Sequence, residues 1–223
     1  MDEPVDTLDE FTDARADEII SRLRAVAKPR LIVISGPSGV GKDTVIDQLR
    51  LRCPDIYFAV TATTRQRRGG EIDGYHYHFF GVAEFEEKIQ ADEFLEWAKV
   101  YGDFFYGVPK TPIRQALERG QHVILKVDTQ GVQTIRKVTT GGVFIFIAPP
   151  SIDELARRLR SRKTDDSEVL MRRLRTAQRE LLLIDAFDYV VFNESDHEED
   201  TVTRIIAILA AEGCKIGQSD MAV

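Results

Sequence analysis

One stretch, LIVISGPSGVGKDTVIDQLR at residues 31–50, constrains the fold of this chain more than any other. Its apolar run, Leu31–Ser35, stops at a Gly-Pro pair and is typical of a strand that is buried on both faces of a parallel sheet. A glycine-rich loop follows, and then Val45, Ile46 and Leu49 are spaced as on the inner face of a helix. Strand, glycine loop and helix in this order predict an α/β fold.

The loop has the spacing of a phosphate-binding loop, G-x-x-x-x-G-K, with Gly36, Gly41 and Lys42 at the fixed positions. Backbone N–H groups at a helix N-terminus form an anion site, and the lysine adds a charge for the outer phosphates. The next position usually carries a hydroxyl that contacts Mg²⁺. Here it is Asp43, whose oxygen can still meet a hard cation directly or through water. We expect ATP phosphates along Gly36, Pro37, Ser38, Gly39, Val40, Gly41, Lys42, Asp43 and Thr44.

Further along the chain, apolar segments alternate with helical patterns. Strands are expected at 122–128, 142–148 and 188–193, and helices at 129–138, 151–162, 167–184 and 198–212. The alternation predicts an open parallel β-sheet flanked by helices, with these strands buried on both faces.

Residues 61–110 break this alternation. An alternating strand at Tyr75–Phe80, a helix from Ala83 and a strand at Phe94–Val100 lead into an aromatic, turn-rich stretch before a helix that starts at Pro112. We interpret the segment as an inserted subdomain with antiparallel strands.

Composition narrows the function classes. The net charge of −7 argues against a general binder of nucleic acid or anionic membranes, and no apolar run approaches the ~20 residues of a membrane span. Two cysteines far apart in sequence favour a reducing, cytoplasmic setting. Residues 1–15 are an acidic tail unlike a secretory signal, and an amphipathic helix follows. A solvated extension that packs one helix on the core is favoured over a partner-binding arm.

Four arginines are candidates for phosphate binding. Arg65 and Arg68 follow a strand in a glycine-rich loop, whereas Arg162 and Arg173 lie on or near the helical pair after Pro150. Guanidinium groups bind phosphate oxygens bidentately, so one pair is suited to an acceptor phosphate and the other to a donor triphosphate. A surface arginine taken alone is more often a solvated charge.

Two acids have two interpretations each. Asp128 ends a buried strand, where ligands bind in parallel sheets, but it can equally cap the following helix. Glu96 is either a surface charge or an acceptor for the N–H groups of a base.

Taken together, these motifs resemble the guanylate kinase family. The matching pieces include ISGPSGVGKDT, TATTRQRRGGEIDGYHYHF, EFLEWAKVYGDFFYG, VDTQGV and RRLRTAQRE, in family order through nearly all of residues 31–193. The resemblance implies phosphoryl transfer from ATP to GMP, and to dGMP, with Mg²⁺. It also implies a P-loop core at 29–60, 111–150 and 180–210, a mixed α+β acceptor subdomain at 61–110, a helical lid at 151–179 and an N-terminal extension at 1–28.

The resemblance also assigns roles to individual residues. As GMP-phosphate contacts it implies Thr61, Arg65, Arg68, Tyr77 and Tyr106. Glu96 and Asp128 correspond to the guanine readers, with Thr111 from the same region; their carboxylates accept from guanine N–H donors that adenine lacks. The cationic catalytic groups are Lys42, Arg65, Arg162 and Arg173, and Asn193 corresponds to a position near the adenine of ATP.

The sequence departs from the family pattern around the expected metal. Asp43 replaces a serine, and Lys126 stands where relatives often carry an acid that touches metal-bound water. Our hypothesis is that Asp43 and Lys126 exchange charge across the Mg²⁺ site, with Asp43 meeting Mg²⁺ through water. Elsewhere, Thr61 replaces a serine, Arg67 replaces a proline, and GDFFYG is one residue longer than its counterpart, which affects the choice of Tyr106.

Two alternative functions are weighed against this one. The first is a guanylate-kinase-like protein-binding module without catalysis, and Lys42 and the four arginines argue against it. The second is a kinase for another nucleoside monophosphate, and Glu96 and Asp128 argue against that. A monomer and a homodimer both stay open, and we expect no nucleic-acid or membrane partner.

Overall fold

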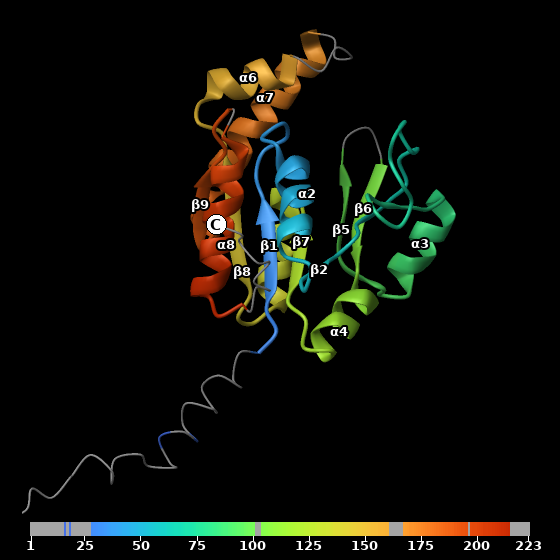
Figure 1. Ribbon diagram of the computed structural model, residues 1–223. Coiled ribbons are helices and arrows are strands. Elements are labelled where there is room, and N and C mark those ends of the chain that lie inside the picture. Colours follow the sequence, from blue (N-terminus) through green and yellow to red (C-terminus); the bar gives the residue numbers. More distant parts are fainter. Residues whose placement is uncertain are drawn as a thin grey trace, which may run out of the picture.

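The computed structural model describes Ala16, Glu18 and residues 28–100, 104–160, 167–195 and 197–214 (Figure 1). The predicted acidic tail, most of the helix after it and the candidate Arg162 lie outside the described residues. Within the described ranges, none of the helices has both the length and the apolar character of a membrane span.

The core is a five-stranded parallel sheet in the order β2-β7-β1-β8-β9. At its centre, β1 (Leu31–Ser35) and β8 (Val143–Ala148) are buried at every residue. β7 (Val123–Lys126) lies on one side of β1, with β2 (Tyr57–Phe58) outside it and β9 (Tyr189–Phe192) at the opposite edge. The predicted parallel sheet is confirmed, and its strands all end at one edge, where ligands bind in such folds.

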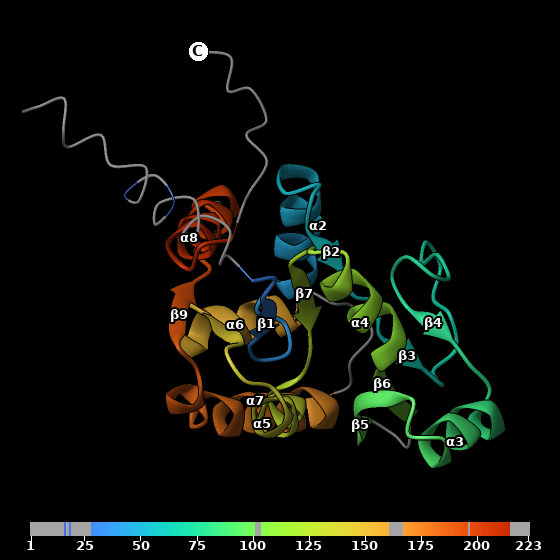
Figure 2. The same ribbon diagram turned by 90° about the horizontal axis from the view of Figure 1, so that it is seen from below.

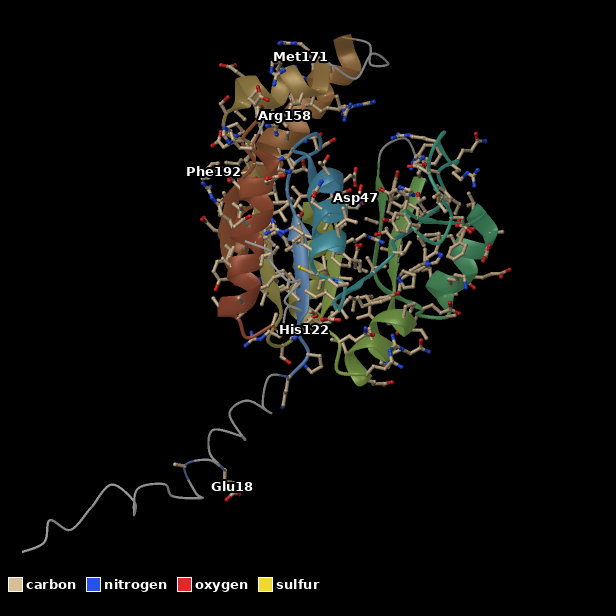
Figure 3. All side chains as sticks on the ribbon, viewed as in Figure 1. Glu18, Asp47, His122, Arg158, Met171 and Phe192 are labelled. Atoms are coloured by element: carbon tan, nitrogen blue, oxygen red, sulfur yellow. The ribbon has the colours of Figure 1, made fainter. Side chains whose placement is uncertain are left out.

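β9 differs from the prediction of a strand that is buried on both faces. Val191 is buried, but Val190 and Phe192 are exposed because β9 lies at the edge of the sheet. Figure 3 shows Phe192 on the outside of the molecule. A short apolar run looks the same in an edge strand and in a central strand, so periodicity alone could not separate them.

Helices cover both faces of the core sheet, as the view along the strands shows (Figure 2). On one face, α2 (Lys42–Arg52) and α8 (Glu198–Ala211) pack their apolar sides against the strands. The other face is packed by α5 (Thr129–Val138) and α4 (Lys110–Glu118). α4 begins two residues before the predicted start, and Pro112 lies in its first turn, where a missing N–H breaks no helical hydrogen bond.

A pair of helices lies above the carboxyl edge of the sheet (Figure 1). α6 (Ile152–Arg160) and α7 (Ser167–Leu181) pack against each other through Leu155, Leu159 and Ala177. This α6/α7 pair is therefore placed over the phosphate loop, residues 36–41.

The insertion forms a second sheet in the order β4-β3-β6-β5. Its strands are β3 (Ala62–Thr63), β4 (His78–Phe79), β5 (Phe94–Val100) and β6 (Phe104–Pro109), and α3 (Val82–Gln90) packs on it. β3, β6 and β5 are antiparallel, as predicted, whereas β4 runs parallel to β3.

Two segments of the insertion differ from the prediction. The stretch expected to be turn-rich contains β6, because it pairs with β3 on one side and β5 on the other. The strand expected at Tyr75–Phe80 shrinks to β4, because a turn precedes it, in which Gly74 N–H donates to Tyr77 O at 2.8 Å.

Candidate active site

The phosphate loop joins β1 to α2 at the carboxyl edge of the core sheet. Gly41 has a φ of 98°, and a Cβ there would lie 2.6 Å from Asn193 Nδ2, so glycine is required on both counts. Lys42 Nζ folds back on the loop and donates to Gly36 O at 2.5 Å and to Pro37 O at 3.2 Å. The loop thus holds an ammonium group at the N-terminus of α2, the arrangement that binds phosphate.

Asn193, predicted to lie near adenine, also supports this loop. Its buried amide donates to Val40 O at 2.7 Å, and its Oδ1 accepts from Thr201 Oγ1 at 2.9 Å. Since Thr201 belongs to α8, Asn193 connects the phosphate loop to that helix.

Thr44, in the first turn of α2, is exposed.

Asp43 and Lys126, which depart from the family pattern around the expected metal, are in direct contact. Lys126 Nζ lies 2.5 Å from Asp43 Oδ1, and it is also 3.4 Å from the Tyr77 hydroxyl and 4.9 Å from the centroid of that ring. The main chain explains the contact, because Lys126 pairs with Ile34 at the end of β1. Burial opposes the charge of Lys126, but Asp43 and Tyr77 outweigh it and raise the pKa of Lys126.

Arg65 is the centre of the predicted acceptor-phosphate residues. Its buried guanidinium forms a two-pronged ion pair with Glu71, at 2.6 and 3.0 Å, and lies 5.4 Å from the centroid of the Tyr77 ring. Burial opposes the charge, but hydrogen bonds with Glu71 and Tyr106 raise the pKa of Arg65. Arg68 is exposed, and its backbone N–H donates to Glu71 at 2.7 Å.

The predicted acceptor residues are thus partly brought together. Thr61 Oγ1 donates to Lys126 O at 3.4 Å, which links it to the same group. We call Thr61, Arg65, Tyr77 and Tyr106 the acceptor cluster. Thr111 is exposed in the first turn of α4, and among the described residues none of the contacts that join the cluster reaches it. Glu71 was not singled out from the sequence, although it is the acid that ends the basic run RQRRGGE.

Glu96 and Asp128 lie close enough to interact. Glu96 is only 8% exposed, and its carboxylate packs against Gly131, where a Cβ would lie 2.8 Å from Oε2. Burial and the nearby charge of Asp128 raise the pKa of Glu96 to about 7. Asp128 does occupy the N-cap position of α5, but its side chain makes no capping hydrogen bond. The two acids therefore form a pair that a base with N–H donors could satisfy.

α7 contacts the phosphate loop with two charged residues. Arg173 Nη2 donates to Ser38 Oγ at 3.0 Å, and the buried Glu180 accepts from Ser38 N–H and from Thr129 Oγ1, both at 3.4 Å. Burial raises the pKa of Glu180, and the nearby ammonium of Lys42 opposes that shift. Arg173 is thus next to the loop, as its predicted role with the donor phosphates requires.

Arg158 on α6 is a site residue that sequence reasoning missed. It donates to Val40 O at 3.2 Å, to Asn193 O at 2.9 Å and to Glu154 Oε1 at 2.8 Å. Figure 3 shows it beneath α6 at the phosphate-loop end of the core. Ser151 caps the start of α6, since its Oγ accepts from Glu154 N–H at 3.1 Å, while the Glu154 carboxylate binds Arg158.

A parallel sheet with this loop at its carboxyl edge, beside a second sheet whose strands and loops carry the acceptor cluster, defines a P-loop phosphotransferase. A sequence profile described as Guanylate kinase matches residues 28–212. The chain belongs to the guanylate kinase family.

Individual relatives agree with the profile. A guanylate kinase from Carboxydothermus hydrogenoformans is 47% identical over 188 residues, 84% of this chain and 91% of the relative. One from Gloeobacter violaceus is 49% identical over 165 residues, 74% and 80% of the two chains. The crystal structure of guanylate kinase from Anaplasma phagocytophilum superimposes with a TM-score of 0.69 at 33% identity, covering 85% of this chain and 88% of that one.

Proposed function

We propose that this chain transfers the γ-phosphoryl group of ATP to GMP and releases ADP and GDP. One observation carries the proposal: the phosphate loop and the acceptor cluster are connected through Lys126, which contacts Asp43 on one side and Tyr77 on the other. Donor and acceptor phosphates can therefore meet at one place.

The acceptor is recognised at two points. Glu96 and Asp128 accept hydrogen bonds from guanine N1–H and N2–H₂, and adenine would leave these carboxylates unpaired. The phosphate of GMP is held by the acceptor cluster and by Arg68. These groups contact the base and the phosphate, which GMP and dGMP share, so the same contacts bind dGMP.

The transfer step needs placement more than covalent help. A phosphate oxygen of GMP forms the new bond to the γ-phosphorus as the bond to the bridging oxygen of ADP breaks, and no strong base is required. Lys42 and Arg173 neutralise the phosphates at the loop. Closing the α6/α7 pair and residues 61–110 over the substrates would exclude water and prevent hydrolysis of ATP.

The residues present fit a Mg²⁺ ion that arrives with ATP. Within the described residues there is no group of three or more His, Cys, Asp or Glu side chains that could hold a metal. Mg²⁺ in phosphotransferases is held largely by substrate phosphates and water, with one or two carboxylates, so a single acid is enough. Asp43, 71% exposed in the first turn of α2, would hold a water ligand of the ion. When bound, the ion neutralises charge on the β- and γ-phosphates.

Product analysis tests the proposal. The chain is incubated with ATP, GMP and Mg²⁺, and the nucleotides are separated by anion exchange. Equal amounts of ADP and GDP are expected, and a Lys42→Ala control should form both about 10³-fold more slowly. ADP without GDP, or no ADP at all, would refute the proposed activity.

A further inference from the structure

Lys126 occupies a position that the proposed transfer does not yet use. It ends β7 beside β1, the strand that leads into the phosphate loop. Its ammonium lies 2.5 Å from Asp43, the residue next to Lys42, and 3.4 Å from Tyr77 of the acceptor cluster. A single cation is thus in contact with both nucleotide sites.

A cation between the donor and acceptor phosphates would favour the proposed reaction. The GMP phosphate and the γ-phosphate are both anionic, and they repel each other as the attacking oxygen approaches phosphorus. Lys42 and Arg173 lie on the donor side, next to Gly36 and Ser38, and Arg65 lies on the acceptor side. Lys126 lies between these two groups of cations.

We propose that Lys126 is a further catalytic residue, whose ammonium contacts the phosphoryl group during transfer, and that Asp43 is the positioning residue that holds this ammonium. The inference rests on the proposed GMP kinase activity and deepens it.

Stability alone gives a weak reason for this ion pair. Lys126 is 21% exposed and Asp43 is 71% exposed, and pairs at such partly exposed places contribute little to folding. An acid in the first turn of α2 would also repel incoming phosphates unless a cation stood against it. With Lys126 held by Asp43, the net charge of the pair is near zero, and the ammonium presents N–H donors to the phosphoryl group.

Binding of a bisubstrate compound tests the role of Lys126. P¹-guanosine-P⁵-adenosine pentaphosphate carries both nucleosides on one phosphate chain, and its affinity is measured by calorimetry in EDTA, so that no metal contributes. Lys126→Met should weaken this compound by about 10- to 100-fold, the contribution of a charged hydrogen bond, while GMP alone changes by less than about threefold. With Mg²⁺, kcat should fall by a similar factor.

Lys88→Met is the matched control. Lys88 also pairs with an acid, Glu93 at 3.1 Å, and also lies over a ring, Phe80 at 5.3 Å, but it is on α3 outside the site. Lys88→Met should leave the affinity for the bisubstrate compound and kcat unchanged. Unchanged bisubstrate affinity in Lys126→Met, with active wild type, would overturn the inference. Wild type without GMP turnover would instead refute the proposed function.

A double-mutant cycle tests the role of Asp43. Asp43→Ser should lower bisubstrate affinity about tenfold in the wild type, because Asp43 acts through the lysine, but it should not lower affinity in Lys126→Met. There it should raise affinity, because without the lysine the acid only repels the phosphates. The same loss in both backgrounds would overturn the positioning role. If Lys126→Met fails to fold, Asp43→Ser alone decides: unchanged affinity for the bisubstrate compound would overturn the inference.

Discussion

Glu96 is nearly buried beside Asp128, and its proposed role in reading guanine predicts that GMP binding depends on pH. Its pKa is raised to about 7 by burial and by Asp128, and only the ionised carboxylate accepts both guanine N–H groups. KM for GMP should therefore rise as the pH falls below 7, by up to about tenfold per unit. The GMP phosphate titrates nearby, with a pKa of about 6. The profile from pH 5.5 to 8.5 is therefore compared with that of Glu96→Gln, and parallel profiles would contradict the assignment.

The same shift predicts how Glu96 affects stability. A carboxyl group whose pKa is raised from 4.5 to about 7 on folding stabilises the folded state when protonated, and this contribution is lost as the pH rises through that window. Ionised Glu96 therefore lowers the free energy of unfolding at pH 8, by at most roughly 3 kcal/mol. Glu96→Gln should raise the melting temperature at pH 8 and change it little at pH 4.5. A variant that melts lower at pH 8 would contradict this expectation.

Gly131 leaves the space in which the Glu96 carboxylate lies. A Cβ would approach Oε2 to 2.8 Å, so Gly131→Ala should displace the carboxylate and raise KM for GMP about tenfold. Alanine also favours the helix by about 1 kcal/mol, so the melting temperature should hold or rise. Loss of GMP affinity without loss of stability is the expected result of kinetics and melting together. Unchanged KM would show that the carboxylate adapts.

At the scale of elements, α6 is tied to the phosphate loop by Arg158. Arg158→Ala removes its hydrogen bonds to Val40 O and Asn193 O, so KM for ATP should rise about tenfold while KM for GMP stays constant. Arg157→Ala is the matched control, because Arg157 pairs with the same Glu154 but is 68% exposed. Equal effects of both variants on KM for ATP would show that the hydrogen bonds of Arg158 to Val40 O and Asn193 O do not determine ATP binding.

The elements also show where sequence reasoning succeeds. β1, β7 and β8 were predicted because a central parallel strand is a nearly continuous apolar run, a pattern that is visible locally. β6 was missed, and β9 was wrongly expected to be buried on both faces, because pairing partners and sheet edges depend on segments far away in the chain.

The same limit applies to the site. The phosphate loop is a contiguous motif and was predicted from its spacing. The Asp43–Lys126 contact joins residues 83 positions apart, and Arg158 acts on a loop 118 positions away. The sequence suggested a charge exchange between Asp43 and Lys126, but only the parallel pairing of β7 with β1 shows why they meet.

At the scale of the whole molecule, we propose that the core sheet carries the donor site and that the inserted sheet carries much of the acceptor site. Lys42→Ala removes the ammonium of the phosphate loop, which is half-buried and bonded to loop carbonyls. We expect kcat to fall by about 10³-fold, with an unchanged circular dichroism spectrum, because the lysine serves charge neutralisation and not the core. Near-normal turnover would contradict the assignment of the donor site.

The most direct test of the account is the acceptor profile. An ADP-release assay with ATP and Mg²⁺ gives kcat/KM for GMP, dGMP, AMP, CMP and UMP in turn. The account predicts turnover with GMP and dGMP and a preference over AMP of about 10⁴-fold, as expected for a site whose buried carboxylates need N–H donors. Comparable turnover with AMP, or none with GMP, would contradict the claim that Glu96 and Asp128 select guanine.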